Sequence, residues 1–216
     1  MSNANSRQQE ELHQIKQMME RSSRFISLSG LSGIAAGTCA LVGAYFASNV
    51  IYKSQGGIIQ GIDINLTNQS PSIADLLGNN LIQIAILTFL ASLVSSFIFT
   101  FLRSKTTNVS VWGTTSKRLF INISIPLLIG GIFLIKLIQI GAVGLVAPGC
   151  LIFYGLALVN ASKFTLIEIK YLGYSQLIIG IVNLCFIEKG IFLWAAGFGG
   201  LHIVYGLIMW LKYERQ

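Results

Sequence analysis

Six long stretches without a charged residue constrain the fold of this chain more than any other feature. They contain 28, 27, 17, 26, 17 and 22 residues between successive charged positions. A helix needs about 20 apolar residues to cross a hydrocarbon layer roughly 30 Å thick, and long side chains at a run's ends can reach the interface. Charged residues make up only 11% of the chain, against about 25% in a soluble domain. We therefore predict an all-α, polytopic membrane helical bundle with six transmembrane helices.

The positive charges predict the orientation of these helices. If the first segment lies in the cytoplasm, 12 of the 15 Lys and Arg residues fall on cytoplasmic segments. The outside segments keep only Lys53, Lys136 and Lys189. This bias follows the positive-inside rule and predicts that both ends of the chain are cytoplasmic. The net charge of +7 is then explained by topology and by anionic membrane lipid, so it does not indicate nucleic-acid binding.

The alternation of apolar and polar segments divides the chain into three regions. The regions are a cytoplasmic amphipathic helix at 1–24, a first transmembrane hairpin at 25–117 and two further hairpins with a short cytoplasmic tail at 118–216. The first hairpin has an outside loop at 53–78 and an inside loop at 103–117, and the later hairpins cover 118–162 and 168–212.

The N-terminal segment has a helical pattern of its own. Leu12, Ile15 and Met19 recur at helical spacing, with charged residues on the other faces. One interpretation is a helix that docks a cytoplasmic protein partner or the membrane surface. The simpler interpretation is a solvated extension of the first span.

Small residues mark where helices are expected to touch. Gly33 and Gly37 form a GxxxG motif in a first span rich in Gly and Ala, which lets two helices approach closely. We expect this span to be the most deeply packed, against the same chain or a second copy in a homo-oligomer. The glycines expected at helix contacts are Gly30, Gly33, Gly37, Gly131, Gly155, Gly180 and Gly206.

The second half of the chain contains an internal repeat. Gly131-Ile132 precedes Gly141 by the same spacing of ten with which Gly180-Ile181 precedes Gly190. Gly149 precedes Tyr154-Gly155 as Gly200 precedes Tyr205-Gly206. Each unit is expected to be a tight hairpin with Gly at the turn, and because both units start inside they are predicted to be parallel repeats.

This repeat resembles the HdeD-like group of small bacterial inner-membrane proteins. The resemblance covers roughly Ile125–Trp210 and rests on the Gly-Ile, Gly and Tyr-Gly positions of the two units. The first two spans, with their long outside loop, depart from the pattern of that group. The resemblance implies a multi-pass protein of a bacterial inner membrane, and some members of the group are linked to acid stress. It implies no particular activity for any residue.

Few polar residues lie inside the predicted spans, and such residues are candidates for function. His202 lies near the middle of the sixth span, and folding the fifth span back against it brings Ser175 and Gln176 to a similar depth. Asn183 is a further intramembrane candidate for contact with a ligand or proton. A lone His without a carboxylate at its depth is a poor proton relay, so an interhelical hydrogen bond of about 0.6 kcal/mol is the simpler interpretation of His202.

The chemistry expected of an enzyme has no counterpart in this sequence. The two histidines, His13 and His202, are far apart in the topology, and no metal, nucleotide or nucleophile motif occurs. We predict no catalytic residues, no metal and no cofactor. The leading hypothesis is a non-catalytic protein that works through lipid or protein partners in assembly, sensing or envelope stress. The alternatives are a small transporter or channel for a neutral or lipid-like solute, and a lipid enzyme using Asp63 or Asp75.

Overall fold

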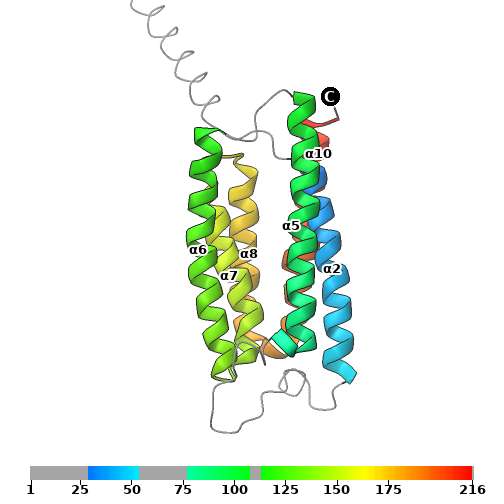
Figure 1. Cartoon of the computed structure of the whole chain (residues 1–216), viewed down its shortest axis with the longest axis vertical. Helices are drawn as coiled ribbons and strands as arrows, with labels where there is room; N and C mark the ends of the chain where they lie inside the picture. The colour runs from blue at the N-terminus through cyan, green and yellow to red at the C-terminus, as the bar shows by residue number, and fades with distance from the viewer. Residues whose placement is uncertain (1–28, 54–76, 108–112, 216) are drawn as a thin grey trace, which may run out of the picture.

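The computed structural model describes residues 29–53, 77–107 and 113–215, which form six helical rods lying side by side (Figure 1). Within these residues there is no strand. The first five rods are α2 (Gly30–Lys53), α5 (Asn80–Thr107), α6 (Thr114–Gln139), α7 (Val146–Ala161) and α8 (Glu168–Cys185). The sixth is continuous through α9 (Gly190–Trp194), the π-helical segment η3 (Ala195–Leu201) and α10 (His202–Tyr213). Short 3-10 turns at Val143–Leu145 (η1) and Ile187–Lys189 (η2) precede α7 and α9.

Five of the six rods are long and apolar enough to cross a membrane. These are the rods built on α2, α5, α6, α7 and α10, and the predicted all-α architecture is thus confirmed for the described residues. The exception, α8, begins with Glu168 and Lys170 and carries Gln176 and Asn183, which lower its hydropathy. The predicted helix at 1–24 and most of the loop at 53–78 lie outside the described residues.

The rods form two groups of three, which appear apart in Figure 1. In the first group α2 packs between α5 and α10, and in the second group α7 packs between α6 and α8. The groups meet along one surface, where α7 and α8 face the last rod. We call this surface the seam.

Glycine backbones make the contacts inside each group close. A Cβ atom added to Gly206 would lie 2.6 Å from the carbonyl oxygen of Gly30, and one added to Gly37 would lie 2.7 Å from that of Gly199. In the second group, a Cβ on Gly155 would lie 2.9 Å from the carbonyl oxygen of Gly173. No side chain fits in these places, so the small residues allow the helices to meet backbone to backbone.

One of the glycines expected at helix contacts is in the open. Gly131 has no neighbour within 4 Å of a Cβ built on it, whereas the adjacent Gly130 faces Phe153 of α7. Consecutive helical residues point about 100° apart, so only one residue of this pair can face the neighbouring helix. The other six glycines each lie against a neighbouring helix: Gly30, Gly33, Gly37, Gly155, Gly180 and Gly206.

Two further expectations about packing are wrong. α2 is not the most deeply packed span, because 28% of its apolar window is buried, against 33% for the rod that contains α7. The hairpin at 168–212 is not tight, because α10 leaves α8 and packs along α2. The glycine faces of α2 and α10 fit each other more closely than α10 fits the polar face of α8. The hairpin at 118–162 does turn on a glycine, since Gly141 follows the end of α6 with a φ of +79°.

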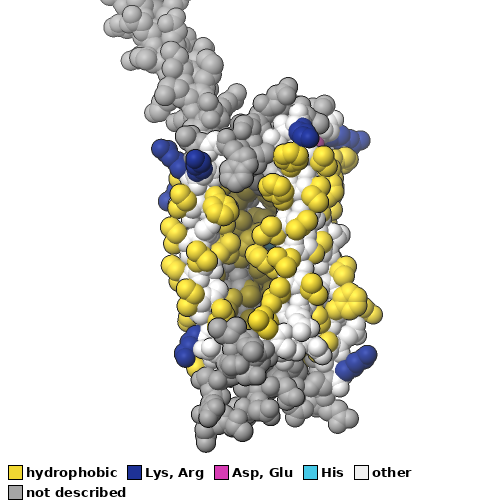
Figure 2. All heavy atoms as spheres, in the orientation of Figure 1, with side chains coloured by type: hydrophobic (Ala, Val, Ile, Leu, Met, Phe, Trp, Pro, Cys, Tyr) yellow, Lys and Arg dark blue, Asp and Glu magenta, His cyan; other side chains and the backbone are white. Residues whose placement is uncertain are grey.

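The basic residues are unequally divided between the two ends of the bundle (Figure 2). Among the described residues, Arg103, Lys105, Lys117, Arg118, Lys163, Lys170, Lys212 and Arg215 lie at or beyond one end. Lys53, Lys136 and Lys189 lie at the opposite end. We call the first of these the basic end.

Candidate functional site

The buried side of α8 carries polar residues among apolar ones. Glu168, Gln176 and Asn183 follow at steps of eight and seven residues, which returns them to roughly one face of the helix. The side chains of Gln176 and Asn183 are completely buried. Ile178 and Ile181 lie on the exposed side. α8 therefore turns its two amides, Gln176 and Asn183, into the seam beside the apolar residues Ile169 and Leu172.

The last rod is interrupted where it meets this polar face. Its π-helical segment contains Gly197, Gly199 and Gly200, and the first two of these are buried. A Cβ on Gly197 would lie 2.7 Å from Oε1 of Gln176, so a larger residue does not fit there. π-Helical turns are rare and occur frequently at functional sites. Here the turn exposes the carbonyl oxygen of Gly197 to side chains of the seam.

Two side chains meet at this carbonyl, and a third is joined to them through His202. Gln176 Nε2 donates to Gly197 O at 2.8 Å, and His202 Nδ1 lies 3.2 Å from the same oxygen. His202 Nε2 lies 2.7 Å from the hydroxyl of Tyr154 on α7. Because a carbonyl oxygen only accepts, we assign the proton of a neutral His202 to Nδ1, which leaves Nε2 to accept from Tyr154. Each hydrogen bond of this cluster joins the second group to the last rod or lies within that rod.

The structure brings together only part of the predicted set. Gln176 Nε2 lies 3.5 Å from His202 Nδ1, as the folding back of the fifth span predicts. Ser175 is half-buried and makes no hydrogen bond to His202, because its position on the helix is turned about 100° from that of Gln176. Asn183 is further along α8 and donates to Gly190 O at 3.3 Å.

Tyr154 is the member of the cluster that sequence reasoning missed. It appears in the sequence as the Tyr of a Tyr-Gly repeat ending, and its ring packs against Phe198 with centroids 5.0 Å apart. Phe198 is also stacked on His202, with an angle of 10° between the ring planes. The sequence signal that could have identified Tyr154 was the recurrence of Tyr at the end of both repeat units. Both of these residues, Tyr154 and Tyr205, pack against the buried cluster of Leu158, Ile169 and Leu172.

At the basic end an ionic contact bridges the two sides of the seam. Glu168 Oε1 accepts from Lys212 Nζ at 2.5 Å and from the hydroxyl of Tyr213 at 2.9 Å. Burial by itself raises the pKa of the Glu168 carboxyl, but the donors Lys212 and Tyr213 outweigh it and hold the pKa below its ordinary value. This contact ties α8 to α10.

A second acidic residue joins the three helices of the first group. Glu214 accepts from the backbone N–H of Gly30 and from Ser29 Oγ, and it lies 3.6 Å from Arg103 Nε. Arg103 also donates to the carbonyl oxygen of Tyr213 at 2.8 Å. A carboxylate at a helix N-terminus satisfies a free N–H and opposes the helix dipole. Glu214 thus caps α2 from α10 while it pairs with α5.

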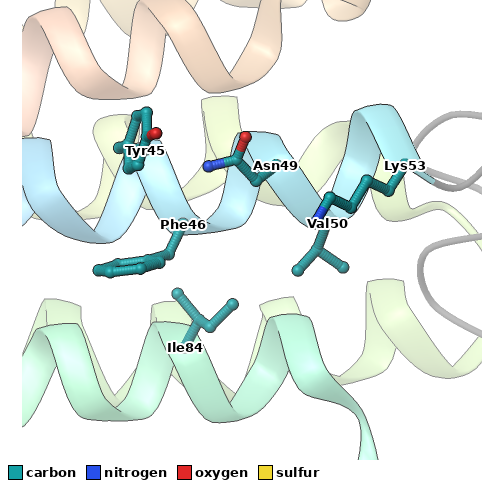
Figure 3. Close-up of a pocket in the computed structure, with 6 residues that line it drawn as sticks. All are labelled: Tyr45, Phe46, Asn49, Val50, Lys53 and Ile84. Atoms are coloured by element: carbon teal, nitrogen blue, oxygen red, sulfur yellow. The ribbon is translucent and has the colours of Figure 1, made fainter.

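An open groove of about 520 Å³ lies between α2 and α5 near the opposite end (Figure 3). Phe46 and Val50 of α2 and Ile84 of α5 form its apolar part, and Asn49 and Lys53 extend along α2 toward the end of the helix. A single exposed lysine beside apolar side chains does not make a specific anion site.

The seam brings two titratable groups together, His202 and Tyr154, but among the described residues no carboxylate is hydrogen-bonded to either of them. In the described part of the chain, no three His, Cys, Asp or Glu side chains are placed to hold a metal ion. Comparison with known proteins adds no identity: no family model, curated protein or solved structure matches this chain.

Proposed function

We propose that this chain is a six-pass integral membrane protein with both ends in the cytoplasm. The unequal charge of the two ends supports this orientation, with the basic end cytoplasmic. α8 completes the six spans, because its polar side chains are turned into the seam and its outer face is apolar. The segments 118–162 and 168–212 are then parallel repeats. Location in a bacterial inner membrane rests on the HdeD-like resemblance alone.

We further propose that the protein is non-catalytic and binds an anionic phospholipid between its two groups. One observation carries this proposal: α5 and α6 do not pack along each other, and the face between them is hollowed and lined by apolar side chains (Figure 2). We call this hollow the furrow. Not one residue in the apolar window of α5 is buried within the protein. The furrow opens sideways at the depth where acyl chains lie.

The charges beside the furrow select the head group. Lys105 at the end of α5 and Lys117 and Arg118 at the start of α6 stand on its two sides at the basic end. All three side chains are exposed. Basic residues at the cytoplasmic surface attract anionic lipid by about 1 kcal/mol each. An acyl chain in the furrow therefore places its phosphate between cations.

Native mass spectrometry of the protein released from lipid nanodiscs tests this proposal. The wild type is expected to retain an anionic phospholipid in preference to a zwitterionic one. The triple variant Lys105→Gln/Lys117→Gln/Arg118→Gln is expected to lose that preference. The matched control Lys53→Gln/Lys136→Gln/Lys189→Gln, at the opposite end, is expected to keep it. Equal retention by both variants contradicts the lipid site.

A co-purifying protein lost on removal of residues 1–20 would instead support a protein partner.

The alternative of a small transporter for a neutral solute has one observation in its favour. Transporters commonly place their sites where a membrane helix is interrupted, and the last rod changes to a π-helix beside Gln176 and His202. Under this alternative, His202→Ala changes solute flux in proteoliposomes while Lys105→Gln does not. Unchanged flux in His202→Ala argues against it.

A further inference from the structure

The seam contains buried polar atoms that nothing in the described residues satisfies. Glu168 Oε2, Gln176 Oε1, Asn183 Oδ1 and the Tyr205 hydroxyl each lack a hydrogen-bond partner there. Gln176 and Asn183 are completely buried. Three of these four atoms are carboxylate or amide oxygens, which can only accept hydrogen bonds in these states. The seam therefore needs donors, and it needs them along much of its length.

The helix contact inside the second group is different. Asn160 of α7 donates to both the backbone oxygen and the side-chain oxygen of Asn122 on α6, at 2.9 and 3.2 Å. A buried acceptor without a donor costs about 1–3 kcal/mol, and more in a membrane, where no bulk water competes. Four such atoms on one surface amount to a large penalty unless donors reach them.

We propose that water enters the seam from the basic end and reaches Gln176. Water is the smallest hydrogen-bond donor available, and one molecule can bond to two to four buried polar groups at once. Glu168 stands at the entrance, Tyr205 and Tyr154 both pack against the buried cluster that follows it, and the Tyr154 hydroxyl lies 2.7 Å from His202 Nε2. This hydration path is independent of the lipid site, since α5 and α6 contribute nothing to it.

Leu151 ends the path before it crosses the protein. This side chain is completely buried and packs between α8 and the last rod, where Cβ atoms on Gly180 and Gly197 would both contact it. Asn183 lies beyond Leu151, toward the opposite end, so the path serves Glu168, Tyr205 and Gln176 and does not reach the Asn183 Oδ1. The path is therefore closed on one side, and His202 exchanges protons with water from the basic end only.

Hydroxyl-radical footprinting of the full chain in nanodiscs, with mass spectrometric detection, tests the path. Radicals formed from water modify aromatic side chains that water touches. Tyr154 and Tyr205 are expected to be modified, whereas Phe153 serves as the control. Phe153 is the neighbour of Tyr154 in sequence and is likewise half-buried, but it packs against Phe133 and Gly130 inside the second group. Modification of the two tyrosines no faster than that of Phe153 overturns the proposal.

The variant Tyr205→Phe gives an independent readout in the same preparation. If water bonds to the Tyr205 hydroxyl, removal of this hydroxyl lowers the melting temperature and reduces the modification of Tyr154. If the seam is dry, the variant removes an unsatisfied buried group and the melting temperature rises. A rise overturns the proposal. Tyr171→Phe, on the exposed side of α8, is the matched control and is expected to change neither value. Should Tyr205→Phe fail to fold, the comparison of Tyr154 with Phe153 in the wild type decides alone.

Discussion

Single side chains in the seam determine how the two groups are held together. The sequence identified His202 and Gln176 as notable because they are polar residues in apolar surroundings. It could not identify Tyr154 as their partner, since that requires knowing that α7 faces the last rod. It also could not show that Ser175 points away from His202. Ser175 and Gln176 are adjacent on one helix, and which of the two faces the seam depends on which side of the helix the fold buries.

The hydrogen bond between Tyr154 and His202 gives a direct test of the seam. Tyr154→Phe removes the hydroxyl that lies 2.7 Å from His202 Nε2 and keeps the ring contact with Phe198. The expected loss of stability is about 0.6 kcal/mol and at most about 1.7 kcal/mol, the range for hydrogen bonds between membrane helices. Equilibrium unfolding in mixed micelles measures it. The control Tyr171→Phe, whose side chain is 64% exposed, is expected to be neutral.

Helices show how far apolar pattern alone can predict a fold. The pattern predicted the spans well, because long apolar runs have few other stable conformations. The pairing of the helices was harder to predict. Sequence neighbours were expected to pack as hairpins, which holds for α6 and α7, whereas α10 packs on α2. Glycine faces decided this pairing, and matching two such faces requires the side-chain directions of both helices.

Two glycine substitutions are expected to have opposite effects on stability. Gly206→Ala places a Cβ 2.6 Å from the backbone of both Gly30 and Ile34, so α2 and α10 must separate. Overpacking of this kind costs about 1–3 kcal/mol. Gly131→Ala meets no atom and replaces a flexible residue within α6, which is expected to stabilise by about 0.5–1 kcal/mol. Thermal unfolding of the two variants beside the wild type checks both signs, and equal effects would contradict the observed packing.

The contact in which Glu214, at the end of α10, caps the N-terminus of α2 can also be tested. Glu214→Ala removes the acceptor of the Gly30 N–H and the partner of Arg103. Loss of a helix N-terminal cap costs about 1 kcal/mol. Hydrogen exchange is expected to increase in the first turn of α2 and at the end of α5. Glu188→Ala, in the exposed turn at the opposite end, is the control and should leave that exchange unchanged. Arg103 entered the sequence analysis only as one of the basic residues that set the orientation, and Glu214 was not singled out, because their partners lie on helices distant in sequence.

At the scale of the whole molecule, the ionic contact at the basic end makes the union of the two groups depend on pH. The pKa of Glu168 in the folded protein is below the value of about 4.3 for a free side chain. The contribution of Glu168 is therefore complete above that value and is lost as the pH falls through the lower, folded pKa. The melting temperature of the wild type should exceed that of Glu168→Gln at pH 7, and the difference should shrink below pH 4. A constant difference would contradict the role of the charge.

The packing of α2 on α10 has a consequence for biosynthesis. The two helices that share the glycine contact are the first and the last of those described, and the residues joined at the cap of α2 are 184 positions apart. At about 5–20 residues per second, a ribosome takes roughly 10–40 s to make that interval. During this time the glycine face of α2 has only lipid or another protein to cover it. A chain arrested before α10 would leave that face open, which gives the cell's membrane quality control a marker of unfinished synthesis.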